Sequence, residues 1–165
     1  MQQDEFDFEL ILGVLVKQQV DFIVVGGLCA VLHGAPIHTQ DLDIVPSRDP
    51  ANLARLESAL HELAAYYREH PPGHILPEAA RMTGPGHHLL RTTAGMIDVL
   101  GAIAGKRDYI ALLPHTIVLE LDDKTSIRIL DLPTLIATKQ ETNRTKDRLV
   151  LPILRHTLEE QERSK

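Results

Sequence analysis

The sequence predicts an α/β (α+β) fold: a mixed β-sheet with helices mainly on one side and two helices in the C-terminal part. Apolar residues recur at helical spacing near both ends of the chain, whereas short β-branched or alternating runs dominate its middle. The elements follow one another as helix, strand, helix, strand, helix, then several strands, then two helices, an order typical of a mixed sheet. With 165 residues, 44% hydrophobic and 24% charged, we expect one domain over residues 1–165.

The first half of the chain alternates between helices and strands. Phe8, Ile11, Leu12 and Leu15 share one helical face, and a short apolar run follows them. Pro50 is suited to the first turn of a long helix, because the first amides of a helix have no partner within it. We expect helices over 5–19, 28–33 and 50–69, and strands over 21–25 and 41–46.

The second half begins with an irregular stretch over residues 70–86, which is rich in Pro and Gly. Long irregular segments are often functional, so we expect it to be a lid or wall of an acceptor site. Asp131 is placed to cap the first of the two closing helices. We expect strands over 88–93, 96–103, 116–121 and 125–130, a helical turn over 109–113, and helices over 132–143 and 146–160.

The net charge and the cysteine content indicate which partners and which cellular compartment to expect. The formal net charge of −6 argues against wrapping long nucleic acid, because such binding neutralises many phosphates. Cys29 is the only cysteine, so no intrachain disulfide can form, and we expect it to be a small core residue. The acidic start MQQDEFDFEL is unlike a signal peptide, and no apolar run is long enough to span a bilayer. We therefore expect a cytoplasmic protein without membrane association.

Gly26 and Gly27 lie between a predicted buried strand and a predicted helix. Glycines at such a turn let the backbone approach phosphate oxygens, and the amides of the next helix point to the same place. A Gly-Gly pair is more often only a tight turn, so this pattern alone leaves both interpretations open.

Asp41 and Asp43 are two residues apart on a predicted strand, so both carboxylates point to one face while Leu42 points to the core. Two carboxylates held so close repel each other unless a cation lies between them. Mg²⁺ prefers carboxylate oxygens together with substrate phosphates. The alternative is a solvated strand end whose Asp residues serve turns and caps.

Asp98 stands among apolar residues in GMIDVL, a predicted central strand. An unpaired buried carboxylate is costly. Asp98 therefore has either a salt-bridge partner or a place beside Asp41 and Asp43, as a third metal ligand or a base.

The stretch VDFIVVGGLCAVLHGAPIHTQDLDIV resembles the core of the nucleotidyltransferase superfamily that includes AbiEii-type toxins and minimal nucleotidyltransferases. That family has a Gly-Gly or Gly-Ser turn, a short helix, and a Thr or Ser two residues before Asp-x-Asp. Gly26, Gly27, Thr39, Asp41 and Asp43 occupy the matching positions.

A second block, LDLPTLIATKQETNRTKDRLVLPIL, resembles the C-terminal portion of the same family, in which a helical Lys precedes an Arg/Lys-Asp cluster. Lys139, Arg144, Lys146 and Asp147 match that pattern. The two blocks frame residues 20–154, and the middle matches through Asp98 alone.

The resemblance implies a metal-dependent nucleotidyltransferase with a nucleoside triphosphate as its substrate. Asp41 and Asp43 would hold one or two Mg²⁺ or Mn²⁺ ions, with Asp98 helping to bind the second. The Gly26-Gly27 turn, with Thr39 beside it, would cradle the phosphates.

Lys139 would contact phosphate from a facing helix, as one of the catalytic residues together with the three aspartates. The acceptor implied by the resemblance is the 3′ end of an RNA such as tRNA, a protein hydroxyl or a small molecule.

Two departures from the family pattern support a second hypothesis. Ile37 stands where many relatives have a phosphate-binding Arg, and Gly27 replaces a Ser whose hydroxyl contacts phosphate. A catalytically weak or inactive relative would bind a nucleotide or a partner protein, as in a toxin–antitoxin-like pair. A third hypothesis is a purely structural domain whose Asp pair serves turns.

Overall fold

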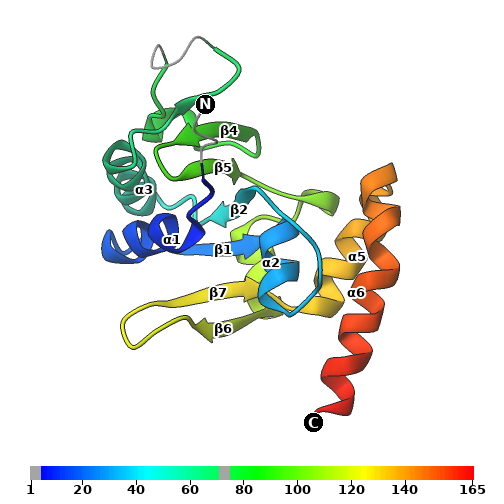
Figure 1. Ribbon diagram of the computed structural model, residues 1–165. Coiled ribbons are helices and arrows are strands. Elements are labelled where there is room, and N and C mark those ends of the chain that lie inside the picture. Colours follow the sequence, from blue (N-terminus) through cyan, green and yellow to red (C-terminus); the bar gives the residue numbers. More distant parts are fainter. Residues whose placement is uncertain (1–4, 71–74) are drawn as a thin grey trace.

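A seven-stranded mixed β-sheet organises the computed structural model, which describes residues 5–70 and 75–165. The strand order is β3-β4-β5-β2-β1-β7-β6 (Figure 1). The predicted fold class is confirmed. The strands are β1 (Phe22–Val25), β2 (Asp41–Pro46), β3 (Tyr66–Tyr67), β4 (His87–Thr92), β5 (Gly95–Leu100), β6 (Thr116–Glu120) and β7 (Ser126–Leu130).

Parallel and antiparallel pairs meet at the centre of the sheet. Strand β1 is antiparallel to β2 and parallel to β7, and β2 is parallel to β5. The outer pairs β4–β5, β3–β4 and β6–β7 are antiparallel. The strands predicted over 116–121 and 125–130 are therefore present as the antiparallel pair β6–β7.

The helices lie in two groups around the sheet. Helices α1 and α3 contact each other, and α5 packs against α6, on opposite flanks of the strands in Figure 1. Asp131 caps α5 as predicted, accepting a hydrogen bond from Thr134 N at 2.8 Å. The helices are α1 (Phe8–Lys17), α2 (Gly26–Leu32), α3 (Pro50–Glu62), α4 (Tyr109–Leu112), α5 (Leu132–Thr142) and α6 (Thr145–Arg163), with 3₁₀ turns η1 (Ala79–Arg81), η2 (Ala104–Lys106) and η3 (Leu113–His115).

One hydrophobic cluster joins α1 and α3 to the sheet. Leu12 of α1 and Leu56 of α3 are completely buried in it together with Leu42 and Ile44 of β2. Because strand residues alternate between faces, burial of Leu42 and Ile44 turns Asp41 and Asp43 of β2 to the other face. Cys29 is buried in this cluster, as predicted.

The predicted helix over 50–69 is too long. Helix α3 ends at Glu62, and Ala64 has a positive φ of 54° that helical backbone does not have. Tyr66 and Tyr67 then form β3 and pair with Arg91 and Leu90 of β4. The apolar stripe of α3 continues into Leu63 and Ala65 in sequence, but edge pairing of two β-favouring tyrosines ends the helix earlier.

Other boundaries differ by a few residues. Helix α2 begins at Gly26 rather than at residue 28. Strand β5 ends at Leu100, and Ile103 instead forms an isolated bridge with Arg107. Residues 71–74 lie outside the described part of the chain, so the predicted role of the 70–86 stretch stays a prediction.

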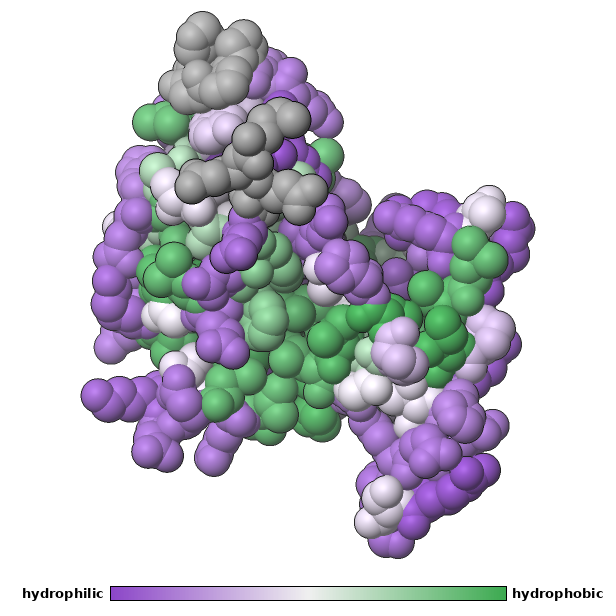
Figure 2. All heavy atoms as spheres, in the orientation of Figure 1, coloured by the Kyte–Doolittle hydropathy of each residue, from purple (hydrophilic) through white to green (hydrophobic). Residues whose placement is uncertain are grey.

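Hydrophobic residues gather at the centre of the face shown in Figure 2, and hydrophilic residues surround them. Among the helices formed by residues 5–70 and 75–165, none combines the length and apolar character needed to cross a membrane.

Asn52 ties the first turn of α3 to the ends of β1 and β2. Its side chain is 1% exposed, accepts a hydrogen bond from Asp21 N at 2.7 Å, and donates to Asp21 O at 3.0 Å and Ser47 O at 2.8 Å. We expect Asn52→Ala to lower the free energy of unfolding by about 2 kcal/mol, because three backbone groups lose their partner. Urea denaturation measures this change.

The matched control is Ser58→Ala, an exposed position on the same helix whose hydroxyl bonds only Ala54 O of its own helix. We expect that change to stay within about 0.5 kcal/mol. Equal effects of the two substitutions would contradict the structural role of Asn52.

Candidate functional site

Three carboxylates meet on the face of the sheet opposite to the buried leucine and isoleucine of β2. Asp41 and Asp43 come from β2, and Asp98 comes from the neighbouring parallel strand β5. The register places Asp43 directly opposite Asp98. One oxygen of each carboxylate lies within 4.8 Å of the others, and all three residues are partly buried. The structure thus brings together the three aspartates that the sequence singled out.

The electrostatics of this cluster favour an added positive charge. Burial, followed by the charges of Asp41 and Asp98, raises the pKa of Asp43 to about 7. Burial and the charge of Asp98 also raise the pKa of Asp41, against the opposing charge of Arg68. Carboxylates whose ionisation is opposed by one another are the donor set that a divalent cation stabilises.

Gly26 brings α2 into contact with Asp43. It has a φ of +70°, and a Cβ at this position would overlap the Asp43 carboxylate. At Gly27 a Cβ would lie 3.0 Å from the Thr39 hydroxyl. The two glycines therefore permit a close approach of the backbone to the carboxylate cluster. They are the first two residues of α2, which is seven residues long.

Thr39 stands at the entrance to β2. Its Oγ1 donates to the Asp41 backbone oxygen at 3.2 Å and lies 3.4 Å from Asp41 Oδ1. The hydroxyl is thus part of the same surface as Asp41 and Gly27.

Arg68 is the site residue that sequence reasoning missed. It follows β3 directly, and its Nη1 donates to Asp98 Oδ1 at 2.7 Å and to Leu90 O at 3.1 Å. The predicted helix over 50–69 had placed it on a helical surface. Two tyrosines in a row after Ala64-Ala65 were the available indication that the chain becomes a strand there.

Lys139 lies on α5 and is engaged by a buried carboxylate. Its Nζ is 3.3 Å from Asp147 Oδ1, and Asp147 also accepts from the Arg144 side chain and the Thr142 hydroxyl. Burial opposes ionisation of Asp147, but these hydrogen bonds and charges hold its pKa well below the usual range. The charge of Lys139 also lowers the pKa of Asp43, so it acts on the carboxylate cluster from α5.

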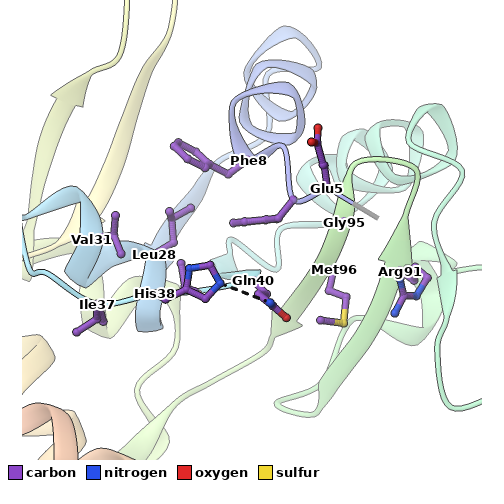
Figure 3. Close-up of a pocket in the computed structure, with 12 residues that line it drawn as sticks. Glu5, Phe8, Leu28, Val31, Ile37, His38, Gln40, Arg91, Gly95 and Met96 are labelled. Carbon is purple, nitrogen blue, oxygen red and sulfur yellow. Dashed lines mark hydrogen bonds between the residues drawn. The ribbon is translucent and has the colours of Figure 1, made fainter. Parts of the chain in front are cut away.

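A cavity of about 760 Å³ adjoins the cluster through Thr39 and Met96, the register partner of Asp41. The three carboxylates do not line it. In Figure 3, Phe8 and Leu28 lie on one side of it and Met96 and Arg91 on the other. The lining residues are Glu5, Phe6, Phe8, Leu28, Val31, Ile37, His38, Thr39, Gln40, Arg91, Gly95 and Met96.

Solved structures resemble this chain over most of its length. TM1012 from Thermotoga maritima, provisionally assigned as a nucleotidyltransferase, has a TM-score of 0.55 at 19% identity, covering 93% of this chain and 91% of that one. The antibiotic-resistance factor ANT(2″)-Ia in solution has a TM-score of 0.61 at 12% identity, covering 92% and 82%. Its crystal structure with adenylyl-2″-tobramycin has a TM-score of 0.59 at 14% identity, covering 92% and 87%.

No protein-family model matches the chain. The search of curated proteins also gives no match. The structural similarities show that the chain has the fold of nucleotidyltransferases.

The raised pKa of Asp43 predicts a pH-dependent stability of the metal-free protein. An unfolded Asp ionises near pH 4, whereas Asp43 in the folded chain ionises near pH 7. The free energy of unfolding should therefore be highest below about pH 4 and fall until about pH 7, for this group. At pH 8 with a chelator, we expect Asp43→Asn to raise the free energy of unfolding by on the order of 1–3 kcal/mol.

Thermal unfolding of both proteins between pH 4 and 8 measures this difference. Asp123→Asn, in the exposed β6–β7 turn, removes the same charge away from the cluster and should not reproduce the gain. A gain from Asp43→Asn that is as large at pH 4 as at pH 8 would be inconsistent with the pKa argument.

Gly26→Ala tests the close approach of α2 to Asp43. Gly34 is the matched control, because it also has a positive φ, of +96°, but a Cβ there meets nothing within 4 Å. If backbone strain were the only effect, Gly34→Ala would be the costlier change, because Ala tolerates φ near +60° better than φ near +96°. The contact with Asp43 is expected to reverse this order. We expect Gly26→Ala to be more destabilising by at least about 1 kcal/mol, measured by urea denaturation. A larger loss of stability from Gly34→Ala than from Gly26→Ala would show that the Asp43 side chain can move aside at little cost.

Proposed function

We propose that this chain is a metal-dependent nucleotidyltransferase, which moves a nucleoside monophosphate from a nucleoside triphosphate to a hydroxyl group. The observation that carries the proposal is the convergence of Asp41, Asp43 and Asp98 on one face of a sheet with the nucleotidyltransferase fold. Because one fold hosts many functions, the carboxylate geometry matters more than the similarity itself.

The carboxylates fit a hard divalent cation such as Mg²⁺ or Mn²⁺. Their oxygens lie within 4.8 Å of one another, and their mutual repulsion is relieved by such an ion. When bound, the ion supplies Lewis acidity to the triphosphate and lowers the pKa of the acceptor hydroxyl.

The chain itself mainly positions the reactants. The lack of a Cβ at Gly26 and Gly27 lets the start of α2 lie against Asp43 and Thr39. Thr39 offers a hydroxyl there, and Lys139 contributes positive charge from α5. The acceptor oxygen attacks the α-phosphorus, the bond from that phosphorus to the bridging oxygen breaks, and pyrophosphate leaves. The hydroxyl proton passes to the Asp98 carboxylate and then to solvent.

A small-molecule hydroxyl is the best-supported acceptor. ANT(2″)-Ia was solved with adenylyl-2″-tobramycin, a nucleotide-modified small molecule. The cavity of about 760 Å³ beside Thr39 has a volume typical of small-molecule sites. An RNA end such as tRNA and a protein hydroxyl remain acceptors to be tested in the same assay.

We expect Mg²⁺ with a nucleoside triphosphate to raise the melting temperature of the wild type by several degrees at saturating ligand, because ligands that bind only the folded state stabilise it. Asp43→Asn should lose this shift, measured within each protein against its own ligand-free value. Asp123→Asn is the charge-matched control and should keep it. Comparing the four triphosphates identifies the preferred base.

Pyrophosphate release in the presence of aminoglycosides, tRNA and cell metabolites then separates the two main hypotheses. Release that Asp43→Asn abolishes supports the transferase. A metal-dependent thermal shift without any release supports the alternative, a nucleotide- or partner-binding module. No shift in the wild type would leave the structural hypothesis and a module that binds only a partner protein, and a pull-down separates these two.

A further inference from the structure

We propose that Arg68 is a resident cation of the carboxylate cluster, so that the cluster takes up one divalent ion, through Asp41 and Asp43, rather than two. Asp98 is then the partner of Arg68 and not a ligand of that ion. The inference rests on the proposed metal-dependent function and assigns a number of ions to its site.

The contact between Arg68 and Asp98 is short and largely removed from water. Nη1 of Arg68 lies 2.7 Å from Asp98 Oδ1, and the two side chains are only 22% and 13% exposed. Ion pairs in such surroundings are screened less than surface pairs, and separating them leaves a charge without its partner. Asp98 is therefore committed to a cation before any metal arrives.

The backbone holds Arg68 in place. Its own N–H donates to Leu89 O at 3.1 Å, and the preceding Tyr67 is paired with Leu90 in the β3–β4 ladder. Nη1 also donates to Leu90 O at 3.1 Å. Strand β4 thus holds Arg68 through its backbone N–H and through its guanidinium. This strand lies next to β5, which carries Asp98.

The charge count favours one ion. Three ionised carboxylates and one guanidinium leave two net negative charges, which a single divalent ion neutralises. A second divalent ion would give the cluster two net positive charges, next to the guanidinium. Lys139 and Lys146, whose charges also reach Asp43 and Asp41, add to that cost.

The geometry assigns the ion to Asp41 and Asp43. These two residues are neighbours on one face of β2, and neither has an ion-pair partner comparable to Arg68 among the contacts of the described chain. Thr39 and Gly26 border the same pair of carboxylates. Arg68 places its positive charge beside Asp98, and that charge also acts on Asp41.

The test is direct titration of the full chain with Mn²⁺, followed by the electron paramagnetic resonance signal of the free ion. We expect the wild type and Arg68→Lys to bind one Mn²⁺ per chain. Arg68→Gln should bind Mn²⁺ more tightly and take up a second ion, because the competing charge is gone.

Two further variants each remove one carboxylate charge from the cluster, from an assigned ligand in Asp43→Asn and from the partner of Arg68 in Asp98→Asn. Asp43→Asn should lose at least about tenfold more Mn²⁺ affinity, about 1.4 kcal/mol, than Asp98→Asn, because only Asp43 is assigned as a ligand of the ion. This comparison stands even if Arg68→Gln does not fold, which circular dichroism would reveal.

Two ions bound by the wild type, or equal losses from Asp43→Asn and Asp98→Asn, would overturn the role of Arg68 while leaving the proposed transferase intact. Absence of Mn²⁺ binding by the wild type would overturn both. The stoichiometry thus separates a failure of this inference from a failure of the proposed function.

Discussion

Repulsion among three carboxylates held by the β2–β5 register is the constraint around which this structure is arranged. Asp43 faces Asp98 because Leu42 and Ile44 are anchored in the core on the opposite side of β2. A slip of one residue would turn the aspartates into the core and the apolar residues out, so the hydrophobic pattern itself enforces the crowding of charge. The fold thereby holds the three aspartates together, although the repulsion between their charges is destabilising.

Positive charge reaches the cluster from two distant parts of the chain. Arg68 arrives from the edge of the sheet after β3, and Lys139 arrives from α5, where the buried Asp147 holds it. Neither cation belongs to the strands that carry the carboxylates. Each is fixed by its own hydrogen bonds, so the electrostatic balance of the site depends on elements at both flanks of the sheet.

Local patterns in the sequence were enough to find Asp41 and Asp43, because alternation on one strand places both on one face. Asp98 needed the additional knowledge that β5 is the neighbour of β2. The cost of burying a lone carboxylate left a salt-bridge partner and a place beside Asp41 and Asp43 both open, and the family resemblance favoured the second. Arg68 was missed because its position depends on where α3 ends, and the apolar stripe of that helix continues in sequence past its true end. The pair Tyr66-Tyr67 was the one opposing signal. The partner of Lys139 likewise depends on how α5 packs against α6.

The fold does not by itself decide the chemistry, since the same sheet serves different activities. In this chain, the chemistry depends on how much negative charge the carboxylate cluster keeps for a metal ion after the positive charge of Arg68 is subtracted. Ile37 lacks the charge that the resembled family pattern has at this position, whereas Arg68 brings a guanidinium to the cluster from another element. A positive charge near a phosphate acts through its position and not through the strand that delivers it. Under the proposed function, Arg68 adds to the site a positive charge that Ile37 does not supply.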